Sequence, residues 1–166
     1  MIFIGIITDL KSENYITKIK EKNYILNKYH IIFITEKNIE NIKNIRFDTI
    51  IINREFNNQY ILDKLIENCK YTIINSDLED ISYFFNKNKF KIITYGFNSK
   101  STITMSSVTE DSILVCIQRN ILNDKNEIEQ QEICIEKSLE SDNYDIMLLV
   151  SMIILYNIED IKKLKL

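Results

Sequence analysis

The chain has 166 residues, of which 45% are hydrophobic and 27% charged, the composition of a globular domain with a buried core. Its 21 basic and 24 acidic side chains leave a net charge of −3, which gives no support for nucleic-acid binding because that needs a basic face. The apolar stretch 146–156 is shorter than the roughly 20 residues that cross a bilayer, and the N-terminus lacks the basic segment of a secretion signal. We expect a cytoplasmic protein without membrane or nucleic-acid partners.

Short apolar runs rich in isoleucine recur through the first 97 residues. Strands that are covered by helices on both faces have this nearly continuous apolar character. The runs predict five strands, at 2–8, 30–35, 48–53, 71–75 and 90–96.

Amphipathic segments alternate with these strands, and three of them predict helices at 12–28, 57–69 and 78–88. The second has the i, i+3, i+4 stripe of a helix in Ile61, Leu62, Leu65 and Ile66. Alternating strands and helices predict right-handed βαβ units. The expected fold class is therefore α/β, a Rossmann-like parallel sheet with flanking helices.

The pattern changes after Gly96, one of only two glycines in a chain without proline. The next segments alternate like half-exposed strands and predict a small three-stranded antiparallel ribbon, at 101–108, 112–120 and 127–138. We expect Gly96 to let the chain turn as it leaves the last parallel strand for the ribbon.

A final helix is expected from Asp142 to Tyr156. The whole chain is predicted to be a single domain, 1–166. Its parts are the parallel βαβ region, the ribbon and the C-terminal helix, at 1–97, 98–138 and 139–166.

Thr8 ends the first strand, and Asp9, Lys11 and Ser12 follow it, at the position where nucleotide-binding folds hold phosphate. A phosphate loop needs glycines so that backbone N–H groups can surround the anion, and this turn has none. The alternative is that Lys11 is a solvated side chain and Ser12 a helix cap. Asn75 ends the fourth strand and completes the candidate site, because parallel strands share one carboxyl edge.

Polar and acidic residues also follow the fourth strand, in Ser76, Asp77, Glu79 and Asp80. Such a cluster could bind a metal or supply an acid–base pair. Ser76 and Glu79 also fit an S-x-x-E capping box that opens the next helix, and this is the favoured interpretation. We predict no metal site.

The three cysteines are far apart in the sequence and lie among apolar residues: Cys69, Cys116 and Cys134. This placement predicts buried free thiols.

The segment YTIINSDLEDISYFFNKNKFKIITYGFNSKSTITMSSV resembles the central domain of the Mur ligases, the ATP-dependent peptidoglycan amide ligases, and of folylpolyglutamate and cyanophycin synthetases. Asn75-Ser76-Asp77 stands where the family has Asn-x-Asp, and Tyr95-Gly96-Phe97 matches its Tyr/Phe-Gly-Phe/Val. Asn143 matches the first Asn of the family's Gly-x-His-Asn-x-x-Asn segment. The resemblance covers about 46–160 and implies descent from an ATP-binding domain.

The same resemblance implies lost activity. The family binds ATP with Gly-x-x-Gly-Lys-Thr/Ser, and Lys11-Ser12 can be laid on its last two residues, but both glycines are missing. Glu55 stands near the family's magnesium-binding Glu without the histidine that follows it there. We also expect the two flanking ligase domains to have no counterpart here. A ligase needs a phosphate cradle, a metal and a closing domain to stabilise its transition state, so we expect a pseudoenzyme.

We therefore expect a non-catalytic Mur-ligase-like module, with no cofactor of its own, that binds an unknown protein partner or small ligand. Its oligomeric state stays open. A first alternative is a sensor that keeps residual ATP and magnesium binding through Thr8, Asp9, Lys11, Ser12 and Asn75. A second alternative is a small-molecule enzyme that uses Asp77 or Glu55 as its acid–base group.

Overall fold

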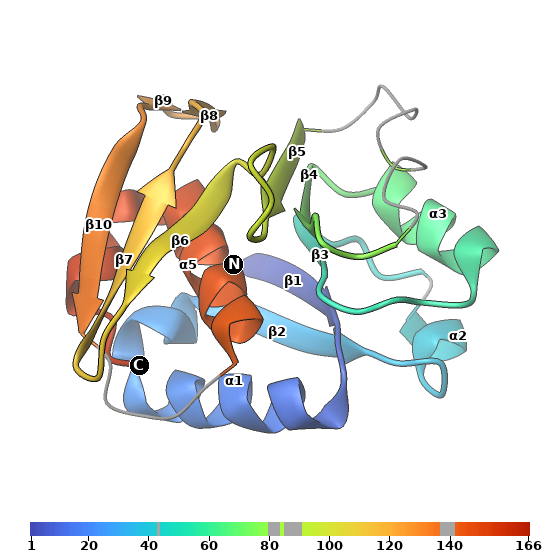
Figure 1. The fold of residues 1–166 in the computed structure, drawn as a ribbon. Helices are drawn as coiled ribbons and strands as arrows, with labels where there is room; N and C mark the ends of the chain where they lie inside the picture. Colours follow the sequence, from blue (N-terminus) through green and yellow to red (C-terminus); the bar gives the residue numbers. More distant parts are fainter. Residues whose placement is uncertain (43, 80–83, 85–90, 137–141) are drawn as a thin grey trace.

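The computed structural model describes residues 1–42, 44–79, 84, 91–136 and 142–166 (Figure 1). The strands of its main sheet are β1 Ile2–Ile7, β2 Tyr29–Ile34, β3 Thr49–Ile52, β4 Tyr71–Asn75, β5 Lys91–Tyr95, β6 Ile103–Val108, β7 Ser112–Ile117 and β10 Gln131–Glu136. The helices are α1 Leu10–Lys22, α2 Ile39–Ile42, α3 Gln59–Glu67 and α5 Asn143–Asn157, with 3₁₀ turns η1 Tyr24–Lys28 and η2 Ile158–Lys163.

The eight strands form one sheet in the order β10-β7-β6-β5-β4-β3-β1-β2. Every neighbouring pair from β2 to β6 is parallel, whereas β6–β7 and β7–β10 are antiparallel. The fold is therefore α/β with a mostly parallel sheet. All five strands predicted in the first 97 residues are present, each within one residue of its expected ends.

The predicted ribbon is not a separate unit. Its three strands β6, β7 and β10 extend the main sheet, because β6 runs parallel to β5 and pairs with it at Tyr95 and Ile103. β5 is thus not the last parallel strand. A small antiparallel pair, β8 (Ile121–Leu122) and β9 (Glu127–Ile128), lies between β7 and β10 in the chain. The alternation of apolar and polar residues could not predict this pairing of β6 with β5. It indicates which face of a strand is buried and not which strand lies next to it.

Helices cover both faces of the parallel strands (Figure 1). Ile16 and Ile19 of α1 share a core with α5 and with the side chains of Ile4 and Ile6. The other face packs against α2 and α3, where a β-carbon on Gly5 would lie 2.7 Å from Ile34. The alternation of strand side chains between these two cores explains why both strand faces are apolar.

Helix α5 is apolar on every side, and all of its residues from Asp145 to Leu155 are buried. It contacts the sheet at β4, β5 and β6 and packs against α1 and η2. The predicted helix over 142–156 is confirmed, with Asp142 as its N-cap through a 2.8 Å hydrogen bond from the Tyr144 N–H. In the described part of the chain, no helix has the length and apolarity needed to cross a membrane.

The predicted helix 12–28 is interrupted at Asn23, where α1 ends and η1 follows. The buried Asn23 amide donates to the carbonyls of Ile19 and Lys165 at 2.8 and 2.9 Å. Asn23 thus ends the helix. Through its bond to Lys165, 142 positions away, it also fixes the C-terminal segment. The helix predicted at 57–69 is confirmed as α3, and the one at 78–88 lies almost wholly outside the described residues.

The cysteine prediction is only partly right. Cys69 is buried, Cys116 is half-buried and Cys134 is exposed. Cys134 lies on β10, which forms one edge of the sheet, and its exposed neighbours include Gln131, Glu132 and Glu136. An edge strand covered on one face only leaves its alternate side chains in solvent.

Gly96 follows β5 with φ at +156°, a conformation that residues with a β-carbon rarely adopt. A β-carbon there would lie 2.7 Å from Ser76 Oγ and 2.8 Å from Asp77 Oδ2. The glycine therefore allows the chain to turn and to pass close to the end of β4.

Candidate functional site at the carboxyl ends of the strands

The site lies where the strand order reverses. β1 has β2 on one side and β3 on the other, so connections leave it in opposite directions. Open α/β sheets hold ligands in the crevice that forms at such a point. The carboxyl ends of β1 and β3 are joined there by a 3.0 Å hydrogen bond from the Asn53 N–H to the Ile7 carbonyl. Thr8 and Asp9 therefore lie beside Asn53 and Arg54.

Asp9 is the N-cap of α1, because its carboxylate accepts the Ser12 N–H at 2.8 Å. The expected cap, Ser12, instead lies buried within the first turn. Serine and aspartate are equally good caps, so the sequence could not distinguish a helix that begins at Leu10 from one that begins later. The carboxylate of Asp9 occupies the position at which this helix would otherwise hold an anion.

Arg54 connects the ends of α1 and α5. Its Nε donates to Asp9 at 2.7 Å, and its Nη2 lies 3.3 Å from Ser12 Oγ and 3.6 Å from the Asp142 carboxylate. Burial alone would lower the pKa of Arg54, but Asp9 and the nearby Asp142 and Asp145 raise it. The guanidinium is therefore permanently charged and held by carboxylates of the protein.

Asn53 is the centre of a buried polar network behind Arg54. Its side-chain amide donates to Thr8 Oγ1 and to Asp145 Oδ1, each at 3.0 Å, and its oxygen accepts the Tyr95 hydroxyl at 2.6 Å. Asn53, Tyr95 and Asp145 are at most 1% exposed. Burial raises the pKa of Asp145 and outweighs the hydrogen bonds from Ser12 and Asn53 that lower it. The network fixes four elements to one another.

Asn75 joins the network from β4. Its amide donates to the Asn53 carbonyl at 3.4 Å, and its oxygen accepts the Asp77 N–H at 3.0 Å. Both polar ends of this buried side chain are therefore used within the protein.

No protein-family model matches this chain, and a search of curated proteins finds no significant match. Its function must therefore be argued from the residues themselves.

Asp77 holds the loop that follows β5. Its carboxylate accepts the N–H groups of Phe97 at 2.6 Å and Asn98 at 3.2 Å, and also the Tyr144 hydroxyl at 3.2 Å. Burial would raise the pKa of Asp77, but these hydrogen bonds and one from the Asn98 side chain together lower it. A carboxylate held ionised in this way is suited to fixing a loop and poorly suited to donating a proton. The helix that Ser76 and Glu79 were predicted to cap falls almost wholly on residues outside the described ranges.

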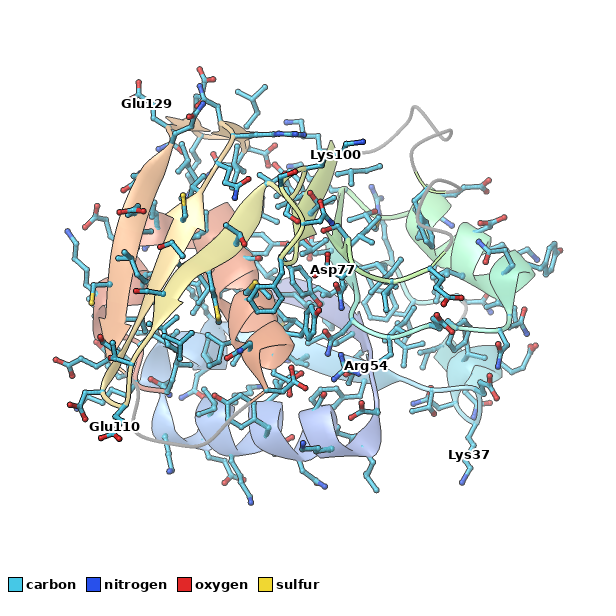
Figure 2. All side chains as sticks on the ribbon, in the orientation of Figure 1. Lys37, Arg54, Asp77, Lys100, Glu110 and Glu129 are labelled. Atoms are coloured by element: carbon cyan, nitrogen blue, oxygen red, sulfur yellow. The ribbon has the colours of Figure 1, made fainter. Side chains whose placement is uncertain are left out.

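The other predicted residues lie apart from this network. Lys11 and Glu55 are both exposed, on the first turn of α1 and in the loop after β3. Figure 2 shows Arg54 below Asp77 in this view, with Lys100 above it. Within the described ranges, no group of three or more His, Cys, Asp or Glu side chains could hold a metal ion.

Four residues of the network were not predicted from the sequence, namely Asn53, Arg54, Tyr95 and Asp145. Asn53 and Arg54 directly follow a buried strand, which is the same signal that singled out Thr8, Asp9 and Asn75. Tyr95 and Asp145 carry no comparable signal. A tyrosine inside a strand and an aspartate in the first turn of a helix are both common structural placements.

Proposed function

We propose that the chain is a non-catalytic binding module, a relative of the Mur-ligase central domain that no longer transfers phosphate. One observation carries the proposal, the contact between the Asp9 carboxylate and the first turn of α1. A triphosphate bound at this position would need the N–H groups and the positive end of the helix that Asp9 already uses. It would also meet the negative charge of Asp9 itself.

The charge around Arg54 supports the same proposal. Asp9, Asp142 and Asp145 all act on this one guanidinium. A nucleotide phosphate could use Arg54 only by displacing carboxylates, and it would then lie among like charges. This disfavours the alternative of a nucleotide sensor that uses Thr8, Asp9, Lys11, Ser12 and Asn75.

The enzyme alternative has less support. An acid–base carboxylate works best with a pKa near the working pH, whereas the pKa of Asp77 is lowered. Glu55 is exposed, and burial is the usual means of raising the pKa of a carboxyl group. We therefore assign Asp77 a structural role in the loop after β5.

The proposal keeps the cytoplasm as the compartment and a Rossmann-like origin for the sheet. The order β2-β1-β3-β4-β5, found in one class of doubly wound nucleotide-binding folds, supports that origin.

Thermal unfolding with Mg-ATP, ADP and UDP-linked muropeptide precursors tests the proposal. A specific ligand at about 100 times its dissociation constant stabilises a protein by about 2.7 kcal/mol, a shift of several degrees. We expect no saturable shift that depends on Lys11, and no release of phosphate from ATP. A saturable shift that disappears in Lys11→Ala and persists in Lys18→Ala, a matched exposed lysine on α1, would favour the nucleotide sensor instead.

A further inference from the structure

A cavity lies beside the candidate site and is lined in part by the loop after β5. It has a volume of about 580 Å³, within the usual range of small-molecule sites. Its polar lining includes residues at the ends of β4, β5 and β7 and in the loop before β6, among them Ser76, Thr94, Ser99, Lys100, Thr102 and Arg119. β5 and β6 pair at a single position, Tyr95 with Ile103, and Thr94 and Thr102 precede that position on the two strands.

The two cations of this cavity differ from Arg54. Lys100 and Arg119 are exposed, and neither forms an ion pair with any of the described residues. Arg54 is neutralised by its carboxylate neighbours, so its charge is not available to a ligand. An anion that enters this cavity therefore meets two positive charges that have no ion-pair partner among the described residues.

Hydroxyl groups stand next to these cations. Thr94 Oγ1 and Thr102 Oγ1 are 3.2 Å apart, and the Thr102 N–H donates to Thr94 Oγ1 at 2.9 Å. Because a hydroxyl hydrogen rotates freely, one of these groups can donate to a ligand while the other remains its partner. Thr94 is only 6% exposed, so such a hydrogen bond would form away from bulk water.

We propose that this cavity binds a small molecule that carries a phosphate group. A phosphate monoester has close to two negative charges at neutral pH and three strong acceptor oxygens, which match two cations and a set of hydroxyl donors. Arg119 supplies the planar fork that pairs with two phosphate oxygens, and Lys100 supplies a point charge. The inference rests on the proposed binding function and names its ligand class. It uses different residues from the buried polar network centred on Asn53.

Isothermal titration of the full chain with phenyl phosphate and with inorganic pyrophosphate tests this proposal. We expect saturable binding to the wild type that weakens as salt is raised. Lys100→Gln and Arg119→Gln should each weaken it by about tenfold or more, which corresponds to about 1.4 kcal/mol. Thr94→Val keeps the side-chain shape and should weaken binding through loss of the hydroxyl. Lys18→Gln and Lys11→Ala, both on α1, should leave the affinity unchanged.

The outcomes separate this inference from the proposed function. Absence of saturable binding by either probe, or affinities that are equal in Lys100→Gln, Arg119→Gln and the wild type, would overturn the cavity assignment and leave the proposed function standing. Binding that is lost only in Lys11→Ala would overturn both. Phosphate release from ATP by a protein whose phenyl phosphate binding depends on Arg119 would overturn the non-catalytic proposal alone.

Discussion

The hydroxyl of Tyr95 donates a 2.6 Å hydrogen bond to the side-chain oxygen of Asn53, and both residues are completely buried although they are 42 positions apart. The bond links β5 to the end of β3, and through the Asn53 amide it extends to Asp145 on α5. The geometry of the carboxyl edge therefore depends on one tyrosine hydroxyl.

Removal of that hydroxyl should destabilise the fold. In Tyr95→Phe the Asn53 oxygen loses its partner inside the core, which typically costs about 1–3 kcal/mol. Urea denaturation should show a lower midpoint with an unchanged slope. Tyr60→Phe is the matched control, because Tyr60 is 68% exposed and its hydroxyl should be dispensable. Equal stabilities for the two variants would contradict the role assigned to the Asn53–Tyr95 bond.

Asp145 should give stability an unusual pH dependence. Burial raises its folded pKa above the unfolded value, so its contribution is full below about pH 3.9 and is lost as the pH rises through the folded pKa. Asp145→Asn cannot titrate. The free energy of unfolding of the wild type minus that of Asp145→Asn should therefore fall as the pH rises from the unfolded pKa, about 3.9, through the raised folded pKa.

Urea denaturation at several pH values measures this difference. Asp111→Asn, at an exposed position in the turn between β6 and β7, is the control and should give a much flatter difference. A wild-type advantage that grows with pH would mean that the network stabilises the ionised carboxylate, contrary to our expectation.

Arg54 should control the ionisation of Asp9. Burial would raise the pKa of Asp9, but the Ser12 N–H and Arg54 together lower it. In Arg54→Gln the Ser12 N–H remains and the positive charge is lost, so the pKa of Asp9 should rise. NMR titration of the Asp9 carboxyl carbon measures this shift. Arg46→Gln removes an exposed arginine that has no ion pair among the described residues, and it should leave the titration unchanged.

The lowered pKa of Asp9 also sets the direction of a stability effect. Its contribution is present above the unfolded pKa and is lost as the pH falls through the folded value. Arg54→Gln should therefore lose less stability on acidification than the wild type does. A steeper acid loss in the variant would show that Arg54 is not the main partner of Asp9.

Gly96→Ala should strain the turn after β5. The φ of +156° is unfavourable for alanine, and the new methyl group would press on Ser76 and Asp77. We expect a loss of more than about 1 kcal/mol, together with faster amide hydrogen exchange at Phe97 and Asn98. Ser106→Ala, at an exposed position on β6, should change neither quantity. Unchanged exchange in Gly96→Ala would show that the turn tolerates a β-carbon.

The sequence was sufficient to predict the elements whose apolar pattern reflects burial. The strands β1 to β5 and the helices α3 and α5 are in this group, because covering a strand or helix demands isoleucine and leucine at fixed spacings. The union of β6, β7 and β10 with the main sheet was not predictable in this way. These strands join the main sheet through the pairing of Tyr95 with Ile103, and neither composition nor periodicity predicts which strands pair.

The candidate site was predictable in position and less so in content. Thr8, Asp9 and Asn75 were found because they lie at or directly after the ends of predicted strands, and the side chain or carbonyl of Asn53 bonds both Thr8 and Asn75. Asp9 is the N-cap of α1 and Ser12 lies inside its first turn, an assignment that depends on the residue at which α1 begins. The pairing of Arg54 with Asp142 joins residues 88 positions apart, which a single sequence cannot relate.

The acidic face of β10 has a consequence for self-association. An edge strand can pair with the same strand of another molecule and so extend one sheet into the next. Here two copies that met along β10 would bring exposed side chains of Glu132 and Glu136 from both molecules close together. At neutral pH, repulsion between these carboxylates would oppose pairing of one β10 strand with another.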